Sequence, residues 1–373
     1  MSGKITASLV ISVLALVVSG ASLAYFILGI SPIAADLNRV SAELSDIKTK
    51  LGAATQEQAL VEAAKAEKTL VLYGPVDAPA MNGIIWARFK VQYPWAELKY
   101  TVGFGPLMAK FVQESKTGVS TADVVMQTNT ALILGPIVEG QTVAFSDNKH
   151  KGLYPTAVLD AESRYYSVFA SPCVAVYNTN KVAVKDLPKQ WMDLTDPKWK
   201  SKMAFPLGSS WGACLAELHA QMGEATWDQF TKGLAANSPV IAESATQAYQ
   251  MVVQGEKDIG IVLVNDLITQ SPDTPVRAIW FQPIPFIPQA VAVAKNAQHP
   301  NLAKLFVEWL TGPEGQASIA ASGRIPILAG VPSPLDKIGG IPAGINLVSG
   351  TNADALKDPN KWLDREKKIF GLP

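Results

Sequence analysis

Short β-rich runs alternate with helical segments over most of this chain, and this alternation limits the folds that it can adopt. In the first half, strands are predicted at 69–73, 97–102 and 123–126, and helices at 80–91 and 106–114. Strands that alternate with helices form βαβ units, in which helices cover a parallel sheet. The sequence therefore predicts an α/β fold.

A second set of such elements follows further along the chain. Strands are predicted at 173–177, 203–205 and 259–264, and helices at 212–222 and 246–253. Because 373 residues are enough for two cores, we expect two α/β lobes. Ligands of open parallel sheets bind beyond the carboxyl ends of the strands. The loops expected to converge on one cleft are those after Tyr73, Val102, Met126, Phe205 and Val264.

The N-terminal part of the chain contains a long segment without charge. No charged residue occurs from Ile5 to Ile30, and a helix of about 26 residues rises roughly 39 Å, more than the hydrocarbon core of a bilayer. We expect residues 1–31 to form a transmembrane anchor, with a signal peptide as the alternative. Lys4 precedes the segment and Asp36 is the first charge after it, which favours an extracellular or periplasmic binding domain.

Residues 32–67 have the composition of a helical stalk or linker. Apolar residues recur there at spacings of three and four, namely Ile33, Leu37, Val40, Leu44, Ile47 and Leu51. A short coiled coil and a single amphipathic helix share this pattern, and about two and a half heptads do not decide between them. Weak self-association through the stalk therefore stays open, and in either form the segment is expected to be a spacer.

Charge and cysteine content exclude several classes of protein. Lys plus Arg and Asp plus Glu both number 32, so no overall charge favours nucleic acid as a partner. The two cysteines, Cys173 and Cys214, are too few for a four-cysteine zinc site or a disulfide-rich scaffold. We expect two separate buried thiols, with a disulfide in an oxidising compartment as the alternative. The three histidines lack metal-ligand spacing, and no cofactor is expected.

Several segments, in order, carry a resemblance to a known family. They are LVLYG at 70–74, ADVVM at 122–126, VYNT at 176–179, DLPKQW at 186–191, LTDPKWKSK at 194–202, PNLAKLF at 300–306 and PEGQ at 313–316. Over about the last 305 residues, the chain resembles the periplasmic solute-binding proteins of ABC importers, specifically the iron-type branch of the type II class.

The resemblance implies a two-lobed fold and a function. Residues 68–168 and 285–373 would form lobe I, and 169–284 lobe II, with two crossover hinge strands near 165–170 and 279–289. Hinge closure would trap a small solute between the lobes and present it to the permease subunits of an importer. Together with the predicted N-terminal anchor, the resemblance leads us to expect a membrane-anchored receptor and no enzyme.

The chain departs from the iron-binding members of this family at one position. Those members carry adjacent tyrosines after the strand that corresponds to 259–264, whereas this chain continues with Asn265, Asp266 and Leu267. The phenolate ligands of ferric ion are therefore missing there. We expect an organic solute and no metal site, with a ferric-ion or other metal receptor as the alternative.

Candidate ligand-binding residues lie near the predicted strand ends and helix starts. Asp77 and Asp266 can pair with a cationic group, hydroxyls at helix starts can bind polar groups, and aromatic side chains suit an organic ligand. Basic residues are scarce in these loops, which favours a neutral, zwitterionic or cationic solute. The full set is Tyr73, Asp77, Phe104, Gly105, Thr128, Asn129, Ser209, Ser210, Trp211, Ser244, Thr246, Asn265, Asp266 and Trp280.

One local motif suggests an enzyme instead. Residues 208–212 fit the Gly-x-Ser-x-Gly pattern of serine hydrolases, with Ser210 as the nucleophile. A triad also needs a histidine and an acid, but His219 lies in the same predicted helix and His299 precedes a proline in a polar segment. The hydrolase is therefore the weaker hypothesis, and no catalytic residue is expected.

Overall fold

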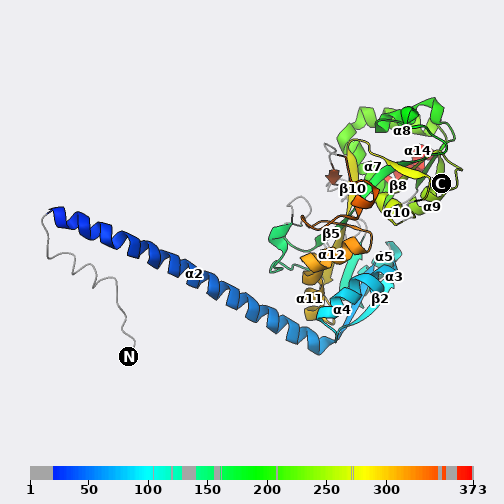
Figure 1. Cartoon of the computed structure of the whole chain (residues 1–373). Coiled ribbons are helices and arrows are strands. Elements are labelled where there is room, and N and C mark those ends of the chain that lie inside the picture. The colour runs from blue at the N-terminus through cyan, green and yellow to red at the C-terminus, as the bar shows by residue number, and fades with distance from the viewer. Residues whose placement is uncertain are drawn as a thin grey trace. The chain divides into compact units, whose positions relative to one another are not determined.

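The computed structural model describes most of the chain (Figure 1). The chain divides into two compact units, Met1–Leu60 and Val61–Pro373. The described residues are 20–103, 105–118, 121–127, 140–154, 160, 162–206, 209–269, 271, 273–342, 347–349 and 359–371.

A single long helix, α2 (Gly20–Glu67), accounts for the described part of the first unit and enters the second. It continues without interruption through Pro32. Part of the predicted anchor and the whole predicted stalk at 32–67 therefore share one helix. Its apolar stripe is exposed to solvent: the exposed fractions of Val40, Leu44 and Ile47 are 53%, 50% and 59%.

The first part of the predicted membrane anchor, residues 1–19, lies outside the described residues. Within the part of the chain that the structure describes, no helix combines the length and apolar character needed to cross a membrane.

The second unit begins with the parallel sheet of lobe I. β1 (Thr69–Gly74) pairs in parallel with β2 (Glu97–Val102) on one side and β3 (Val124–Gln127) on the other. β3 pairs antiparallel with the long strand β10 (Ile284–Ala294). Two short strands also pair with β10, namely β4 (Thr142–Val143) and β12 (Leu347–Ser349).

Helices cover this sheet. Met108 and Phe111 of one helix pack on Tyr73, Val125 and Ala290 of the sheet. A second group of helices meets through an aromatic cluster that includes Trp86, Phe89, Phe306 and Trp309. The helices of this lobe are α3 (Ala78–Ala80), the π-helical η1 (Met81–Trp86), α4 (Ala87–Gln92), α5 (Gly105–Lys116), α11 (Pro300–Thr311) and α12 (Pro313–Ala321).

Lobe II is built on the second half of β5 (Tyr166–Asn178). β8 (Ile259–Leu263) and β9 (Val276–Ile279) pair antiparallel with β5. β6 (Met203–Pro206) lies parallel between β8 and β7 (Val240–Ala242). The sheet is therefore mixed, with a parallel part at the end away from β5.

Successive residues of a strand point to opposite faces of a sheet, and lobe II buries both faces. Cys173, Ala175 and Tyr177 belong to a core with α7 and α8, whereas Val174 and Val176 belong to a core with α9 and α10. The helices of this lobe are α7 (Ser209–Met222), α8 (Glu224–Ala236), α9 (Ala245–Val253), α10 (Val264–Ile268) and the C-terminal α14 (Pro359–Phe370). The remaining short elements are η2 (Lys151–Leu153), η4 (Val184–Asp186), η5 (Trp191–Thr195), η6 (Pro197–Trp199), β11 (Ile325–Pro326) and η7 (Pro334–Ile338).

Two long antiparallel strands join the lobes. β5 pairs with β10 as far as Pro172, and from Cys173 onward it pairs with β8. The same strand therefore belongs to the sheets of both lobes. The polypeptide returns from lobe II to lobe I through β10. β5 and β10 overlap the hinge segments that the resemblance implies near 165–170 and 279–289.

The C-terminal helix α14 packs against α7 and α8 of lobe II. Ile369 and Phe370 pack on the core that these two helices share, and the ring centroids of Phe370 and Phe205 are 6.1 Å apart. The sequence-based division places residues 285–373 in lobe I, and the lobe boundaries remain a prediction.

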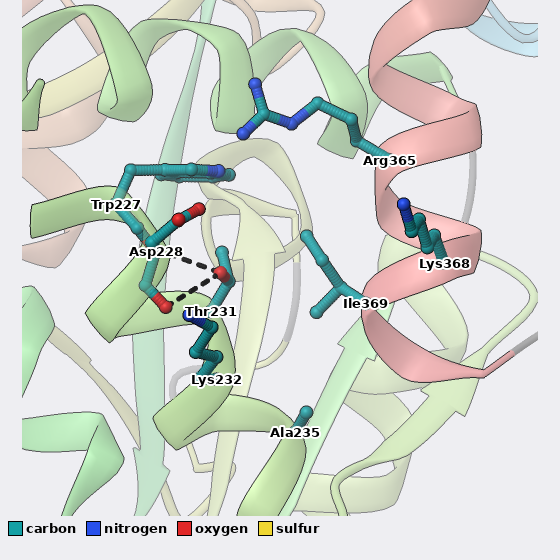
Figure 2. Close-up of a pocket in the computed structure, with 8 residues that line it drawn as sticks. All are labelled: Trp227, Asp228, Thr231, Lys232, Ala235, Arg365, Lys368 and Ile369. Carbon is teal, nitrogen blue, oxygen red and sulfur yellow. Dashed lines mark hydrogen bonds between the residues drawn. The ribbon is translucent and has the colours of Figure 1, made fainter. Parts of the chain in front are cut away.

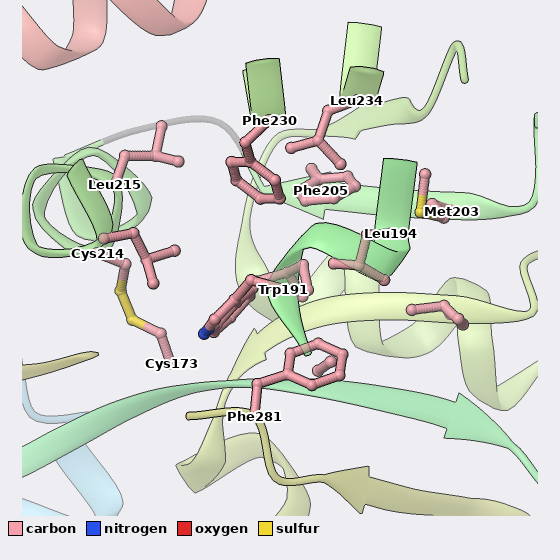
Figure 3. Close-up of a cluster of buried hydrophobic side chains, with 14 of the residues drawn as sticks. Cys173, Trp191, Leu194, Met203, Phe205, Cys214, Leu215, Phe230, Leu234 and Phe281 are labelled. Carbon is pink, nitrogen blue, oxygen red and sulfur yellow. A yellow bond between two sulfur atoms is a disulfide. The ribbon is translucent and has the colours of Figure 1, made fainter. Parts of the chain in front are cut away.

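The two cysteines form a disulfide that joins β5 to α7 (Figure 3). The expectation of two separate thiols is therefore wrong. Both residues lie in the core between the lobe II sheet and α7, only 1% exposed. Their Cα atoms are 6.4 Å apart, within the range that a disulfide spans.

The last turn of α2 is anchored to lobe I. Ala64 is fully buried, and the carboxylate of Glu67 accepts hydrogen bonds from the N–H groups of Asn301 (3.2 Å) and Leu302 (2.7 Å) at the start of α11. His299 is the N-cap residue of this helix, but its side chain makes no capping hydrogen bond. The carboxylate of Glu67 therefore takes the role of the cap.

Replacing Glu67 by alanine is expected to lower the free energy of unfolding by about 1–2 kcal/mol, because the first N–H groups of α11 lose their acceptor. Denaturant unfolding measures the change. Glu62→Ala removes an exposed carboxylate from the same helix and serves as the control, expected within about 0.5 kcal/mol of the wild type. Equal effects of the two substitutions would contradict the capping role.

Candidate functional site

A carboxylate and a hydroxyl meet in lobe II at the starts of two helices. Thr246 lies in the first turn of α9, and Asp266 lies in α10, directly after β8. Thr246 Oγ1 donates to Asp266 Oδ1 at 2.7 Å. Burial raises the pKa of Asp266, although the hydrogen bond from Thr246 opposes the rise. Among the described residues, no lysine or arginine forms an ion pair with this carboxylate.

Ser244 is the N-cap of α9, as its position in the sequence suggests. Its Oγ accepts a hydrogen bond from the N–H of Gln247 at 3.1 Å. The side chain therefore fixes the start of the helix that carries Thr246. Its hydroxyl hydrogen remains available to a neighbouring acceptor.

A polar cluster lies where β5 passes from one lobe to the other. Asn265 Nδ2 and Gln289 Nε2 both donate to Ser171 Oγ, at 3.3 and 3.4 Å. Asn265 Oδ1 is buried and has no hydrogen-bond partner among the described residues. Buried polar atoms in folded proteins are nearly always paired, so this oxygen is suited to a donor from a ligand.

A second pair of charges lies in lobe I, after β1 and before β11. Arg324 Nη2 donates to Asp77 Oδ2 at 2.9 Å, and Asp77 Oδ1 accepts from the N–H of Ala80 at 2.8 Å. Burial raises the pKa of Asp77, but the hydrogen bonds from Ala80 and Arg324 outweigh it, and the net pKa is lowered. The Arg324 guanidinium also lies 5.7 Å from the ring centroid of Phe169 in β5, so it is held from two sides.

Gly323 brings this part of lobe I to α10 of lobe II. Its φ is +79°, and a Cβ there would lie 3.0 Å from Thr269 Cγ2, directly after α10. A side chain at this position would be strained and crowded. The loop that carries Arg324 therefore reaches the helix that carries Asn265 and Asp266.

Two other predicted site residues are largely enclosed. Tyr73 is 2% exposed and packs beneath α5 with Met108 and Phe111, with Lys110 Nζ 5.4 Å from its ring centroid. Trp280 is half-buried against the core that includes α9 and α10. Their role in binding stays a prediction.

Several predicted site residues lie, wholly or with their side chains, outside the described residues. Phe104, Thr128 and Asn129 lie outside the described residues. Gly105 is the first residue of α5. Ser209, Ser210 and Trp211 form the first turn of α7, but the description does not extend to their side chains.

The serine hydrolase hypothesis requires a histidine near Ser210. His219 Nε2 pairs with Glu224 near the end of α7. His299 Nδ1 lies 2.9 Å from Asp123 Oδ2 in lobe I. Each of these two imidazoles is thus paired with a carboxylate that lies outside the Gly-x-Ser-x-Gly segment.

Arg324, Ser171 and Gln289 were missed by the analysis of strand ends and helix starts. Arg324 precedes a two-residue strand near the C-terminal end, and Ser171 and Gln289 lie within long hinge strands. One sequence signal was available for the latter pair: polar residues inside runs that are otherwise apolar. No comparable signal marks Arg324.

Comparisons with known proteins agree with the two-lobed fold. A periplasmic binding protein from Actinobacillus pleuropneumoniae, solved with fructose-6-phosphate bound, superposes with a TM-score of 0.70 at 18% identity, over 82% of this chain and 100% of that one. A probable ABC transporter periplasmic-binding protein from Sinorhizobium fredii is 25% identical over 70% of this chain and 74% of the relative.

The Fe(3+)-binding periplasmic protein of Serratia marcescens is 25% identical over 181 residues, which are 46% of this chain and 53% of the relative. The match thus spans about half of that relative. Two α/β lobes joined by hinge strands define the class of periplasmic-binding-protein folds. Residues 121–338 match the model of a family within it, and the chain belongs to that family, the bacterial extracellular solute-binding proteins.

Proposed function

We propose that this protein is the extracytoplasmic solute-binding receptor of an ABC importer, which captures a small organic solute between its lobes. The observation that carries the proposal is the position, where the hinge strands meet lobe II, of a carboxylate without a described cationic partner and of a buried acceptor without a described donor. Asp266 is a partly buried carboxylate without a described cationic partner, and Asn265 Oδ1 is a buried acceptor without a described donor. Both groups lie in α10, which the Arg324 loop of lobe I approaches.

The charges on the two sides indicate the chemistry of the solute. Asp266 and Asn265 offer acceptors, so they favour a protonated amine or hydroxyl groups on the solute. Arg324 is already paired with Asp77, so its charge is partly compensated. These groups together support a cationic, zwitterionic or hydroxylated organic solute over a polyanion.

Closure about the hinge strands would couple capture to delivery. A solute that contacts both lobes stabilises the closed form in proportion to its extra contacts there. The permease subunits would then distinguish loaded from empty receptor by the relative position of the lobes. Tyr73, Phe104, Gly105, Thr128 and Asn129 of lobe I, with Ser209, Ser210, Trp211, Ser244 and Trp280 of lobe II, are proposed to complete the site.

The N-terminal segment is proposed to hold the receptor at the membrane, with its binding lobes extracellular or periplasmic. The support is the absence of charge from Ile5 to Ile30. The exposed stripe of α2 at Val40, Leu44 and Ile47 is consistent with weak self-association of the stalk. Sedimentation of the full chain and of a Leu44→Glu variant would distinguish a dimer from a single helix.

The identity of the solute is the decisive test of the receptor. Mass spectrometry of small molecules released from gently purified protein is expected to find one organic solute near equimolar amount. Small-angle scattering should then show a more compact particle after that solute is added back to stripped protein. Stripped protein that binds no organic solute from a chemically diverse set would contradict the proposal.

Ferric ion is the second candidate, because a relative from Serratia marcescens is named for binding it. Among the described residues, no group of three or more His, Cys, Asp or Glu is arranged to hold a metal ion. After β8 this chain has Asn265 and Asp266 where iron-binding members of the resembled family have tyrosines.

Titration of the stripped protein with ferric citrate is therefore expected to produce no visible charge-transfer band of a tyrosinate–iron complex. The same protein must still bind its organic solute in a parallel sample, which serves as the control for folding. A saturable visible band would overturn the organic-solute proposal and favour a metal receptor.

A further inference from the structure

A pocket lies between α8 and the C-terminal helix α14, on the outer side of lobe II. Figure 2 shows side chains of both helices projecting into the space between them. The volume is about 570 Å³, within the range of small-molecule sites in proteins. It is lined by Trp227, Asp228, Thr231, Lys232 and Ala235 of α8 and by Arg365, Lys368 and Ile369 of α14.

This pocket is separate from the candidate interlobe site. α7 and α8 cover one face of the lobe II sheet, and α9 and α10 cover the other. Thr246 and Asp266 therefore lie on the opposite side of the sheet from the pocket. A ligand between α8 and α14 would not compete directly for those two groups.

Positive charge dominates the lining. Lys232, Arg365 and Lys368 contribute three basic groups, Asp228 contributes one carboxylate, and Glu224 pairs with Arg365, which leaves a local excess of one positive charge. The whole chain has a net charge of zero, so this excess is local. An anion would be attracted to the pocket by this charge, with Lys232 on the α8 side and Lys368 on the α14 side (Figure 2).

The inner wall is apolar and held in place. The buried indole of Trp227, Ala235 and Ile369 provide apolar surface. Thr231 Oγ1 donates to the carbonyl oxygen of Trp227 at 3.0 Å, within its own helix. Its hydroxyl hydrogen is therefore engaged, and the wall selects a ligand by shape and apolar contact.

An ion-pair chain fixes one end of the pocket. Arg365 Nη2 lies 2.8 Å from Glu224 Oε1, and Glu224 also pairs with His219 of α7. The hydrogen bond from Arg365 and then that from His219 lower the pKa of Glu224 to about 2. These contacts connect α14 to α8 and, through Glu224, to α7.

We propose that the pocket between α8 and α14 is a second binding site, for a small amphipathic organic anion such as an aromatic carboxylate. Lys232 and Lys368 attract the anionic group from the two walls of the pocket, and the apolar body lies against Trp227, Ala235 and Ile369. Because one wall belongs to the C-terminal helix, occupancy ties α14 to lobe II.

Calorimetry with 2-naphthoate on the full chain tests this site, with the uncharged 2-naphthamide as the matched compound. One-to-one binding of the naphthoate is expected, weaker by roughly tenfold or more in Lys232→Glu/Lys368→Glu, because two attractive charges become repulsive. Lys90→Glu/Lys99→Glu, which changes two exposed lysines of lobe I, is expected to leave affinity unchanged. Ala235→Phe fills the pocket without changing charge and is expected to abolish binding.

Several outcomes would overturn the proposal. They are an absence of saturable naphthoate binding, equal weakening in both double lysine variants, and naphthamide binding as tight as that of naphthoate. Displacement of naphthoate by the interlobe solute, with Ala235→Phe having no effect, would also place the anion in the other site. Melting temperatures of all variants are measured alongside, and Ala235→Leu is used as the pocket-filling variant if Ala235→Phe fails to fold.

Discussion

Removal of the Cys173–Cys214 disulfide is expected to lower the free energy of unfolding by about 4 kcal/mol. The bond closes a loop across a sequence separation of 41 residues, and in the chain-entropy account such a link restricts the unfolded chain far more than the folded one. The double variant Cys173→Ala/Cys214→Ala removes the bond and leaves no reactive thiol. Urea unfolding without reductant measures the difference from the wild type.

The position of the disulfide adds a functional expectation. Cys173 is the first residue of β5 that pairs with β8, directly after the part of the strand that pairs with β10. Cys214 belongs to α7, whose first turn carries the candidate residues Ser209 and Ser210. The bond therefore links a hinge strand to a candidate binding helix, and solute affinity should fall together with stability.

Reductant provides the matched control for the disulfide. Dithiothreitol should shift the unfolding midpoint of the wild type toward that of the double variant and leave the variant unchanged. If the wild type and the variant unfold at the same urea concentration without reductant, the disulfide does not contribute to stability, and this prediction is wrong.

The regular elements of the lobes were predictable because hydrophobic periodicity and strand composition are local signals. β2 begins and ends at the predicted residues, 97 and 102, and β1 extends only one residue beyond the predicted 69–73. The predicted helix at 80–91 corresponds to α3, η1 and α4 together. Its central π-helical turn has no signal in a pattern with a period of 3.6 residues.

Contacts between distant segments were harder to predict. Cys173 and Cys214 pair because β5 and α7 are neighbouring layers of one core, and spacing in the sequence does not report which layers touch. The pair Asp77–Arg324 joins residues 247 positions apart. Asp77 was singled out because it follows a strand, whereas its partner required the C-terminal segment to be placed beside β1.

The rule that looks for site residues at strand ends and helix starts found some residues of the lobe II polar cluster and not others. It selected Thr246 and Asp266 separately, and the structure brings them within 2.7 Å. It also selected Asn265, but it gave no indication of Ser171, because that residue lies inside β5. A rule based on strand ends does not detect residues in the hinge strands themselves.

Asp266→Asn is expected to have opposite effects on solute affinity and on stability. Asparagine keeps the shape of the side chain but removes the charge that a cationic or hydroxyl-bearing solute would contact. The loss of one such buried contact corresponds to about 1–3 kcal/mol, or roughly a 5- to 150-fold weaker affinity. Calorimetry with the identified solute measures this change.

Stability should change in the other direction at neutral pH. Burial favours the neutral carboxyl and raises the pKa of Asp266 above its unfolded value. Folding therefore favours the protonated form of Asp266. The resulting contribution to stability is fully present below the unfolded pKa and is lost as the pH rises through the folded pKa. At pH 7 the wild type holds a partly buried charge that asparagine lacks, so the variant should melt at a higher temperature.

The difference between Asp266→Asn and the wild type should shrink as the pH is lowered through the raised pKa, because the wild-type carboxyl then becomes neutral as well. Asp273→Asn changes an exposed carboxylate of the same lobe and should alter neither affinity nor melting temperature. A variant at 266 that loses both stability and affinity would indicate that Asp266 supports the fold of α9 and α10 through Thr246. A variant that gains stability and loses affinity would indicate that the carboxylate is kept ionised in a partly buried position because the solute requires it.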